Sequence, residues 1–217
     1  MMHSTYTGPT GRFSRIDLYD PIVRWTLRER TFKKALLHQA RLSPGQRVLD
    51  LGCGTGTLVL LAHQFFPGLH VVALDADRLA LQLARRKLSG LPQGPALIRG
   101  LAQALPFADE AFDRVLSTLL FHHLPLDGKQ QALREVHRVL RRGGEFHLAD
   151  FGHPGNWLMR IAFTAVRWVD GPETTWEHLL GRLPALLEQA GFAEVEETRR
   201  VDTVFGTLRL YRAIKKA

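Results

Sequence analysis

Three glycines and an aspartate between residues 47 and 77, in the stretch RVLDLGCGTGTLVLLAHQFFPGLHVVALDAD, have the types and spacing of a ligand site. Gly52, Gly54 and Gly56 follow a short apolar run, and Asp75 ends the next run, 23 residues beyond Gly52. Glycines let a backbone turn sharply and approach a ligand closely, and the N–H groups that open a following helix favour an anion. A carboxylate at the end of the neighbouring strand can accept both hydroxyls of a ribose. The pattern therefore predicts a nucleoside ligand that carries an anionic group.

The spacing of the glycines argues against two common nucleotide motifs. The dinucleotide fingerprint is G-x-G-x-x-G, whereas this chain places its third glycine one position early and has Thr57 at the last fingerprint position. The chain also lacks the G-x-x-x-x-G-K-[ST] loop that binds nucleoside triphosphates. We therefore expect neither NAD nor a nucleoside triphosphate as the ligand.

Two adjacent histidines in the segment FHHL could do acid–base chemistry. His122 and His123 directly follow an expected strand, and the ordinary pKa of histidine suits a general base. We take His122 as the candidate base and His123 as a substrate-side residue; alternatively, one histidine packs in the loop and the other contacts water or ligand. His147, on a later strand, is interpreted as structural. Cys53, the single cysteine, is interpreted as a packing residue of the ligand loop, and no metal site is expected.

Alternating strands and helices are expected to position these residues. Five short runs have the character of strands, at 47–51, 70–75, 96–99, 112–118 and 145–151. Helical patterns occupy 55–66, 77–89 and 126–141, and the last of these is expected to end at Gly143 and Gly144. This alternation is typical of an α/β protein with a doubly wound parallel sheet and helices on both faces. Ligands of such sheets bind at the carboxyl ends of the strands.

The two ends of the chain differ from this middle part. Residues 20–40 have a helical pattern, and residues 1–42 are expected to form an N-terminal helical cover. The tail predicts a helix at 176–190 and then two antiparallel strands that turn near Phe205 and Gly206. The length suits a single domain, 1–217.

Composition and charge limit the class of protein. The chain is 45% hydrophobic and 23% charged, as an ordinary globular protein is. No apolar run approaches the roughly 18 residues of a membrane span, and the start of the chain does not resemble a secretory signal. With a single cysteine, these features predict a cytoplasmic protein. The net charge of +8 leaves three alternatives open: contact with nucleic acid, contact with an anionic membrane surface, or a solvated basic surface.

The segment LDLGCGTG resembles motif I of the class I S-adenosylmethionine-dependent methyltransferases. VVALDAD is similar to the second motif of this family, and GLAQALPFADEAFDRVLSTLLFHHL, residues 100–124, is similar to the third and fourth motifs. ALREVHRVLRRGGEFHLADF and LLEQAGFAEVEE resemble later elements of one subgroup. That subgroup includes the ubiquinone/menaquinone C-methyltransferases and related small-molecule and phospholipid methyltransferases.

The resemblance implies a Rossmann-like sheet of seven strands, mostly parallel with an antiparallel C-terminal hairpin, and S-adenosylmethionine as the cofactor. It also implies that the glycine loop faces the methionine portion of this cofactor with support from Asp50. Asp75 would lie at the ribose, the adjacent Ala76 would also contact the cofactor, and backbone groups near Ser117 would close the site.

One position departs from the family pattern. The family usually has an Asp after the third strand, where it holds the adenine amino group, whereas this chain has Leu101. Adenine would then rest on the side chain of Leu101 and on the backbone near Ala102, with Gln103 close by.

Residues 152–175 follow the fifth strand, where the family inserts its substrate cover. A helix over 156–169 would carry polar residues on one side and apolar residues, among them the substrate-side candidates Trp157 and Phe163, over much of the rest. This pattern fits a lid over an apolar pocket or a helix on an anionic membrane, and the alternative is a core helix with a solvated stripe. We expect a small, lipophilic acceptor that is quinone-like, phospholipid-like or another secondary metabolite, with peripheral membrane contact as a further expectation.

Two other functions compete with this one. Enzymes of the superfamily that methylate base amines typically use an Asn/Asp-Pro-Pro-aromatic motif after the fourth strand, and this chain has STLLFHH there. The Pro-Cys nucleophile of the cytosine 5-methyltransferases is also absent, so nucleic acid is not expected as a partner. A protein that binds S-adenosylmethionine without doing chemistry is the second alternative.

Overall fold

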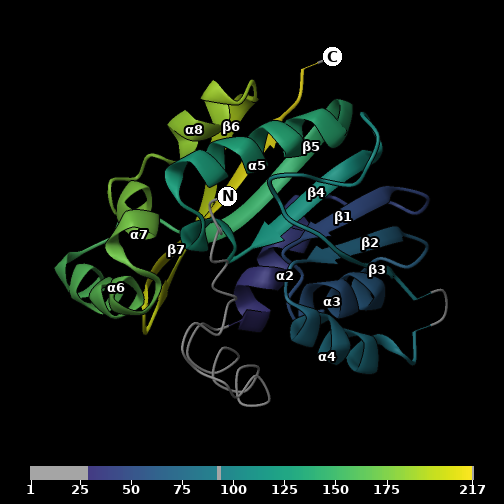
Figure 1. Cartoon of the computed structure of the whole chain (residues 1–217), viewed down its shortest axis with the longest axis horizontal. Coiled ribbons are helices and arrows are strands. Elements are labelled where there is room, and N and C mark those ends of the chain that lie inside the picture. Colours follow the sequence, from purple (N-terminus) through teal and green to yellow (C-terminus); the bar gives the residue numbers. More distant parts are fainter. Residues whose placement is uncertain (1–28, 92–93, 217) are drawn as a thin grey trace, which may run out of the picture.

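A computed structural model describes residues 29–91 and 94–216, which form one seven-stranded sheet between layers of helices (Figure 1). The strand order is β3-β2-β1-β4-β5-β7-β6. The first five strands pair in parallel, and β7 pairs antiparallel with β5 and with β6. The strands are β1 Arg47–Leu51, β2 His70–Asp75, β3 Ala96–Arg99, β4 Phe112–Thr118, β5 Leu140–Phe151, β6 Ala193–Thr203 and β7 Gly206–Ile214. This topology confirms the predicted doubly wound sheet and its antiparallel C-terminal hairpin.

The helices bury one apolar core on each face of the sheet. Strand residues alternate between the two cores: Val48 packs with α2, α3 and α4, whereas the next residue, Leu49, packs with α5 and α8. The helices are α2 Glu29–Gln39, α3 Thr57–Phe65, α4 Arg78–Leu88, η2 Phe121–His123, α5 Leu126–Val139, α6 Trp157–Asp170, α7 Pro172–Leu179 and α8 Leu183–Gln189. The second half of the helix predicted at 20–40 is present as α2. The first half of that predicted helix lies outside the described residues, as does most of the predicted N-terminal cover at 1–42.

Two predicted helices differ from the structure. The helix expected to run to residue 141 ends at Val139, because Leu140 is buried and pairs with Phe112 as the first residue of β5. The helix expected at 176–190 is instead two short helices, α7 and α8. Gly181 between them has a left-handed φ of 69°, and Pro184 in the first turn of α8 could not donate a hydrogen bond in a continuous helix.

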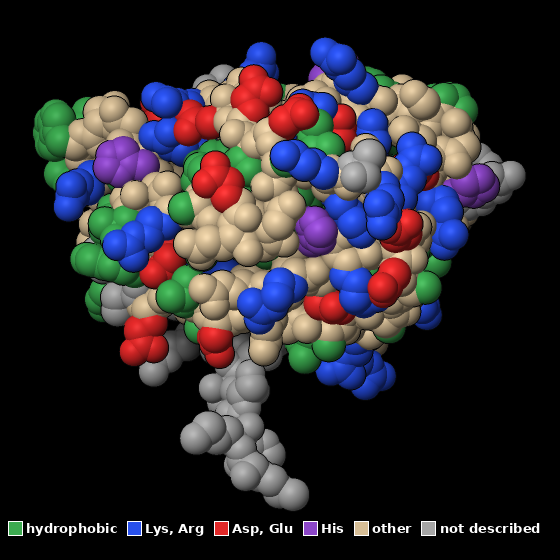
Figure 2. Space-filling view, turned by 90° about the horizontal axis from the view of Figure 1, so that it is seen from above, with side chains coloured by type: hydrophobic (Ala, Val, Ile, Leu, Met, Phe, Trp, Pro, Cys, Tyr) green, Lys and Arg blue, Asp and Glu red, His purple; other side chains and the backbone are tan. Residues whose placement is uncertain are grey.

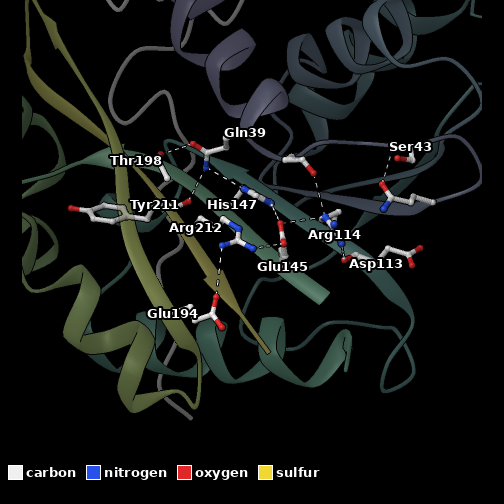
Figure 3. Close-up of polar contacts among 12 residues, drawn as sticks. Gln39, Ser43, Asp113, Arg114, Glu145, His147, Glu194, Thr198, Tyr211 and Arg212 are labelled. Atoms are coloured by element: carbon white, nitrogen blue, oxygen red, sulfur yellow. Dashed lines mark hydrogen bonds and ion pairs between the residues drawn. The ribbon is translucent and has the colours of Figure 1, made fainter. Parts of the chain in front are cut away.

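A polar network around Glu145 and His147 joins β5 to α2 and β7 (Figure 3). Glu145, near the start of the long strand β5, accepts hydrogen bonds from Nη2 of Arg212 at 2.6 Å and from Nε2 of His147 at 3.0 Å. Nε2 of Gln39 on α2 donates to Nδ1 of His147 at 3.2 Å and to the carbonyl oxygen of Tyr211 at 3.0 Å. His147 is fully buried in this network, which agrees with its interpretation as a structural residue.

Candidate functional site

Strands β2 and β3 lie on one side of β1, and β4 and β5 lie on its other side, so the strand order switches between β1 and β4. A pocket lies at the carboxyl ends of the strands beside this switch point. Its lining comes from the ends of β1, β2 and β3 and from both sides of η2. The lining residues are Leu51, Gly52, Leu74, Asp75, Ala76, Gly100, Leu101, Ala102, Gln103, Leu120 and Leu124. Residues from four separate sequence segments, including five of the predicted cofactor residues, are thus brought to one place.

The three glycines of the loop all have left-handed φ angles, between 53° and 79°, which favour glycine. A Cβ on Gly54 would meet no atom within 4 Å, so this glycine faces open space at the site. A Cβ on Gly52 would lie 3.1 Å from Leu120 in the pocket wall. A Cβ on Gly56 would lie 2.8 Å from Leu88 on α4, so Gly56 serves the close packing of α3 against α4. The loop therefore leaves one side open to a ligand and packs its other side against the protein.

Asp75 is buried at the end of β2 and holds the glycine loop. Its Oδ2 accepts a hydrogen bond from the backbone N–H of Gly54 at 2.8 Å, and its Oδ1 accepts one from the N–H of Asp77 at 2.8 Å. Burial raises the pKa of Asp75 above its ordinary value, and these two hydrogen bonds oppose that rise. Each carboxylate oxygen has a second lone pair, so Asp75 can still accept the hydroxyls of a ribose.

Asp50 is a buried carboxylate with no partner for either oxygen within the described ranges. Only 1% of the residue is exposed, and burial raises its pKa to about 7; the charge of Lys33 opposes this rise and that of Asp75 adds to it. A buried polar group without a hydrogen bond costs folding free energy and is therefore uncommon. An ammonium group of a ligand at the adjacent glycine loop would supply the missing donor, and the amino acid portion of S-adenosylmethionine carries such a group.

The turn after β3 places the residues predicted to hold adenine in the pocket wall. Leu101 is 48% exposed, and its backbone carbonyl accepts a hydrogen bond from the N–H of Ala104 at 3.2 Å. Ala102 and Gln103 line the pocket beside it. The apolar side chain of Leu101 and the amide of Gln103 therefore lie where the family that this chain resembles usually has an Asp.

Ser117 and Cys53 lie within the protein rather than in the pocket lining. Oγ of Ser117 is fully buried and donates to the carbonyl oxygen of Leu51 at 2.9 Å, which ties β4 to β1. Cys53 is buried, and burial raises the pKa of its thiol well above the ordinary value. A thiol with a raised pKa is a poor nucleophile, in agreement with the packing role expected for Cys53.

His122 is buried in the single-turn helix η2, between the pocket-lining residues Leu120 and Leu124. Its Nδ1 is 2.7 Å from Oδ1 of Asp150, which is fully buried near the end of β5. The ring of His123, which is half-buried, lies 3.9 Å from the ring of His122. Sequence reasoning did not select Asp150, although an acid near the end of a strand beside β4 was a signal that could have identified it.

The two lid candidates on α6 differ in exposure, and neither lines the pocket. Trp157 is 69% exposed, whereas Phe163 is 1% exposed and has its ring centre 5.2 Å from that of Phe151 on β5. Phe163 also meets the backbone at Gly206, so it packs α6 onto the C-terminal hairpin. The substrate-side position expected for Phe163 is thus a core position, because the apolar side of α6 is wide enough to supply both a core face and an exposed face.

Comparison with known proteins adds family information to this geometry. A sequence family described as a methyltransferase domain matches residues 48–144. An uncharacterised methyltransferase of Synechocystis is 37% identical over 169 residues, which cover 78% of this chain and 77% of that protein. The ubiquinone/menaquinone biosynthesis C-methyltransferase of Shewanella frigidimarina is 29% identical, over 86% of this chain and 80% of that protein.

Among solved structures, the phosphoethanolamine N-methyltransferase 2 of Haemonchus contortus in complex with S-adenosyl-L-methionine superposes with a TM-score of 0.75. It is 16% identical, and the match covers 98% of this chain and 60% of that chain. At this identity the likeness establishes the shared fold.

Proposed function

The chain belongs to the class I S-adenosylmethionine-dependent methyltransferases, and from this premise we propose that it methylates a small lipophilic acceptor at the carboxyl edge of its sheet. The observation that carries the proposed cofactor site is the buried carboxylate of Asp50, which has no protein partner in the described part of the chain and lies next to the open glycine loop. In this proposal Asp50 accepts the ammonium group of the cofactor and Asp75 accepts the ribose hydroxyls. Adenine lies against Leu101, Ala102 and Gln103.

The bound cofactor supplies a methyl group that its sulfonium already activates. The protein then has to align the acceptor with this methyl group and exclude water, and such alignment can contribute most of the rate. Leu120 and Leu124 contribute apolar pocket wall on either side of η2 and so restrict water. An acceptor that must lose a proton before it takes the methyl group also needs a base, and His122 between these two residues is the candidate.

The exposed surface of α6 supports a lipophilic acceptor and contact with an anionic membrane. Four large apolar side chains on α6 are between 52% and 91% exposed: Trp157, Leu158, Ile161 and Trp168. Arg160 is exposed on the same helix, and the chain carries a net charge of +8. Figure 2 shows hydrophobic side chains gathered at the left end of the molecule, where Figure 1 places α6, with basic side chains beside them. A surface of this kind suits an interfacial helix from which an apolar acceptor could reach the site.

Two further observations bear on the acceptor and on the membrane. The Shewanella relative is named as a C-methyltransferase of quinone biosynthesis, which supports a quinone-like acceptor with a carbon nucleophile. No helix among residues 29–91 and 94–216 is long and apolar enough to cross a membrane. In this proposal the membrane contact is peripheral and takes place through the exposed apolar side chains of α6.

A labelling experiment tests the proposed function. The protein is incubated with methyl-labelled S-adenosylmethionine and with three fractions of a cell extract: lipids, polar small molecules and nucleic acids. We expect label in the lipid fraction, and much less of it when Asp75→Ala, whose affinity for the cofactor should be weaker, replaces the wild-type protein at a low cofactor concentration. Label in the nucleic-acid fraction would contradict the proposal, and cofactor binding with no label in any fraction would favour a protein that binds the cofactor without chemistry.

Co-sedimentation with vesicles tests the membrane part separately. We expect the protein to sediment with vesicles of an anionic phospholipid and not with vesicles of phosphatidylcholine alone. The exposed-face variant Ile161→Glu should lose this association while keeping its melting temperature, since Ile161 is 62% exposed. Equal binding by Ile161→Glu would show that α6 is not the contact surface.

A further inference from the structure

Asp150, a residue that no motif of the sequence singled out, is fixed in place at the end of β5. Its Oδ2 accepts a hydrogen bond from the N–H of Phe121, and its Oδ1 accepts one from the N–H of Phe151, both at 2.7 Å. The carboxylate is completely buried. Burial alone would raise the pKa of Asp150, but the charge and hydrogen bond of His122, the charge of His178 and the hydrogen bond from the N–H of Phe151 together hold the pKa far below its ordinary value. Asp150 is therefore an ionised and immobile acceptor at neutral pH.

The backbone before His122 adopts an uncommon conformation that brings the histidine to this acceptor. Leu119 has a φ of 56°, a left-handed backbone conformation that residues other than glycine rarely adopt. Its N–H donates to the carbonyl oxygen of Ala149 at 2.9 Å, so the chain turns at the end of β4 while still attached to β5. Strained backbone of this kind is concentrated at functional sites. The turn allows Nδ1 of His122 to reach Oδ1 of Asp150 at 2.7 Å.

We propose that Asp150 is the positioning residue of the proton-accepting histidine, holding His122 in the tautomer whose Nε2 carries the lone pair. An ionised carboxylate can only accept hydrogen bonds, so a contact at Nδ1 requires the hydrogen of the ring to be on Nδ1. The lone pair of a neutral ring is then on Nε2. This inference rests on the proposed function, because only an acceptor that loses a proton needs such a base.

The proposed step combines a proton transfer to His122 with the transfer of the methyl group to the acceptor. A hydroxyl or acidic C–H group of the acceptor gives its proton to Nε2 of His122, and the electron pair left on the acceptor forms the bond to the methyl carbon. The bond between that carbon and sulfur breaks, and its electrons stay on sulfur, so the sulfonium becomes a neutral thioether. The histidine ends as an imidazolium ion paired with ionised Asp150, which stabilises the charge it has gained.

Other titratable groups lie around the pair formed by His122 and Asp150. His178 on α7, with its ring centre 6.2 Å from that of His122, is fully buried; its Nδ1 donates to the carbonyl oxygen of Phe151 at 2.6 Å. Burial lowers the pKa of His178 to about 4, so the ring of His178 is neutral at neutral pH. Lys129 on α5 donates to the carbonyl oxygens of Leu124 and Thr174, both at 2.5 Å. His123 lies beside His122, and the charge of Glu177 acts on Lys129.

Nitrogen NMR on the unmodified protein tests the tautomer without any acceptor. We expect the His122 ring, assigned with the variant His122→Gln, to be protonated on Nδ1 at pH values where the ring is neutral. In Asp150→Asn, the midpoint of the His122 titration should move to lower pH because the neighbouring negative charge is gone. A wild-type ring protonated on Nε2 would overturn the proposal, whether or not Asp150→Asn folds.

Kinetics on single and double variants test the role in the reaction. Asp150→Asn should lower kcat by roughly a hundred-fold or more, the scale of general-base contributions, and leave KM for S-adenosylmethionine within about two-fold. Its acid limb in the pH–rate profile should move to lower pH. In a His122→Ala background the same change should cause no further loss, because Asp150 acts only through His122. Asp109→Asn, at an exposed carboxylate paired with Arg138, is the matched control and should retain wild-type kcat.

The outcomes separate this inference from the proposed function. Full activity in Asp150→Asn, or losses that multiply in the double variant, would overturn the positioning role while methyl transfer stands. Absence of methyl transfer by the wild-type protein to every extract fraction would contradict the proposed function, and the NMR result would then decide whether Asp150 sets the tautomer.

Discussion

At the scale of single residues, the buried carboxylate of Asp50 couples cofactor binding to protons. Its pKa of about 7 in the folded protein means that it is partly protonated near neutral pH, and a bound ammonium group would favour the ionised form. We predict that S-adenosylmethionine binding at pH 7 releases a fraction of a proton, measured by calorimetry in two buffers of different ionisation enthalpy. The Asp50→Asn variant has no carboxyl proton to release at this position, and it should bind the cofactor more weakly.

Asp50 also affects the stability of the cofactor-free protein in a definite direction. The unfolded carboxyl titrates near its ordinary value of 3.8 and the folded one at about 7, so the folded state holds the extra proton between these values. The contribution of Asp50 to the free energy of unfolding should therefore fall as the pH rises from about 4 to 7. Asp50→Asn should be less sensitive to pH in this window, and an unchanged pH dependence would contradict the assigned pKa.

Asp75 supports both the cofactor and the loop that faces it. Asp75→Ala removes the predicted ribose acceptor and also the hydrogen bond to the N–H of Gly54, so we expect cofactor binding to weaken by about 1.5–3 kcal/mol. Titration calorimetry measures this, with circular dichroism to show that the variant is folded. Wild-type affinity in a folded variant would contradict the role of Asp75.

At the scale of secondary-structure elements, α6 combines a buried anchor with an exposed apolar face. Phe163→Ala should leave a cavity between α6 and the Phe151 ring and lower the free energy of unfolding by about 3 kcal/mol or more. Trp157→Ala on the exposed face should change it by less than about 0.5 kcal/mol. Denaturant unfolding measures both values, and equal effects of the two substitutions would contradict this description of α6.

The kinetic effect of these two substitutions should differ as well. Trp157 is on the surface that we propose for contact with lipid, so its loss should raise the apparent KM for a lipophilic acceptor. Phe163→Ala should act on stability first, because its side chain is covered by β5 and β7.

At the scale of the whole molecule, the network around Glu145 joins α2, β4, β5 and β7. The hydrogen bond from His147, and then that from Arg212, hold the pKa of Glu145 far below its ordinary value against the effect of burial. Stability from this carboxylate is therefore present above its unfolded pKa, near 4.5, and is lost progressively as the pH falls below that value. We expect Glu145→Gln to lower the free energy of unfolding at pH 7 by about 1–3 kcal/mol.

The difference between Glu145→Gln and the wild type should shrink on acidification below about pH 4.5. Denaturant unfolding at a series of pH values measures it, with Glu188→Gln at an exposed position of α8 as the control. A difference that stays constant down to low pH would show that the network contributes through packing rather than through charge.

Local spacing in the sequence was enough to determine the alternation of strands and helices, the glycine loop and the place of Asp75. These features depend on residues close together in the chain, because side-chain periodicity and the conformational freedom of glycine act locally. The breaks that separate α7 from α8 were also available locally, in Gly181 and Pro184, although the predicted helix ran through them.

Only the tertiary structure decided how distant residues meet. His122 and Asp150 are 28 residues apart in the chain, and they touch because β4 and β5 are parallel neighbours whose carboxyl ends share one edge. The missing partner of Asp50 depends on every segment that surrounds it, and no sequence pattern reports an absent hydrogen bond. Phe163 and Trp157 belong to the same apolar helix, and which of them is buried depends on where β5 and β7 lie. Periodicity states that a helix has an apolar side, whereas packing determines which part of that side is covered.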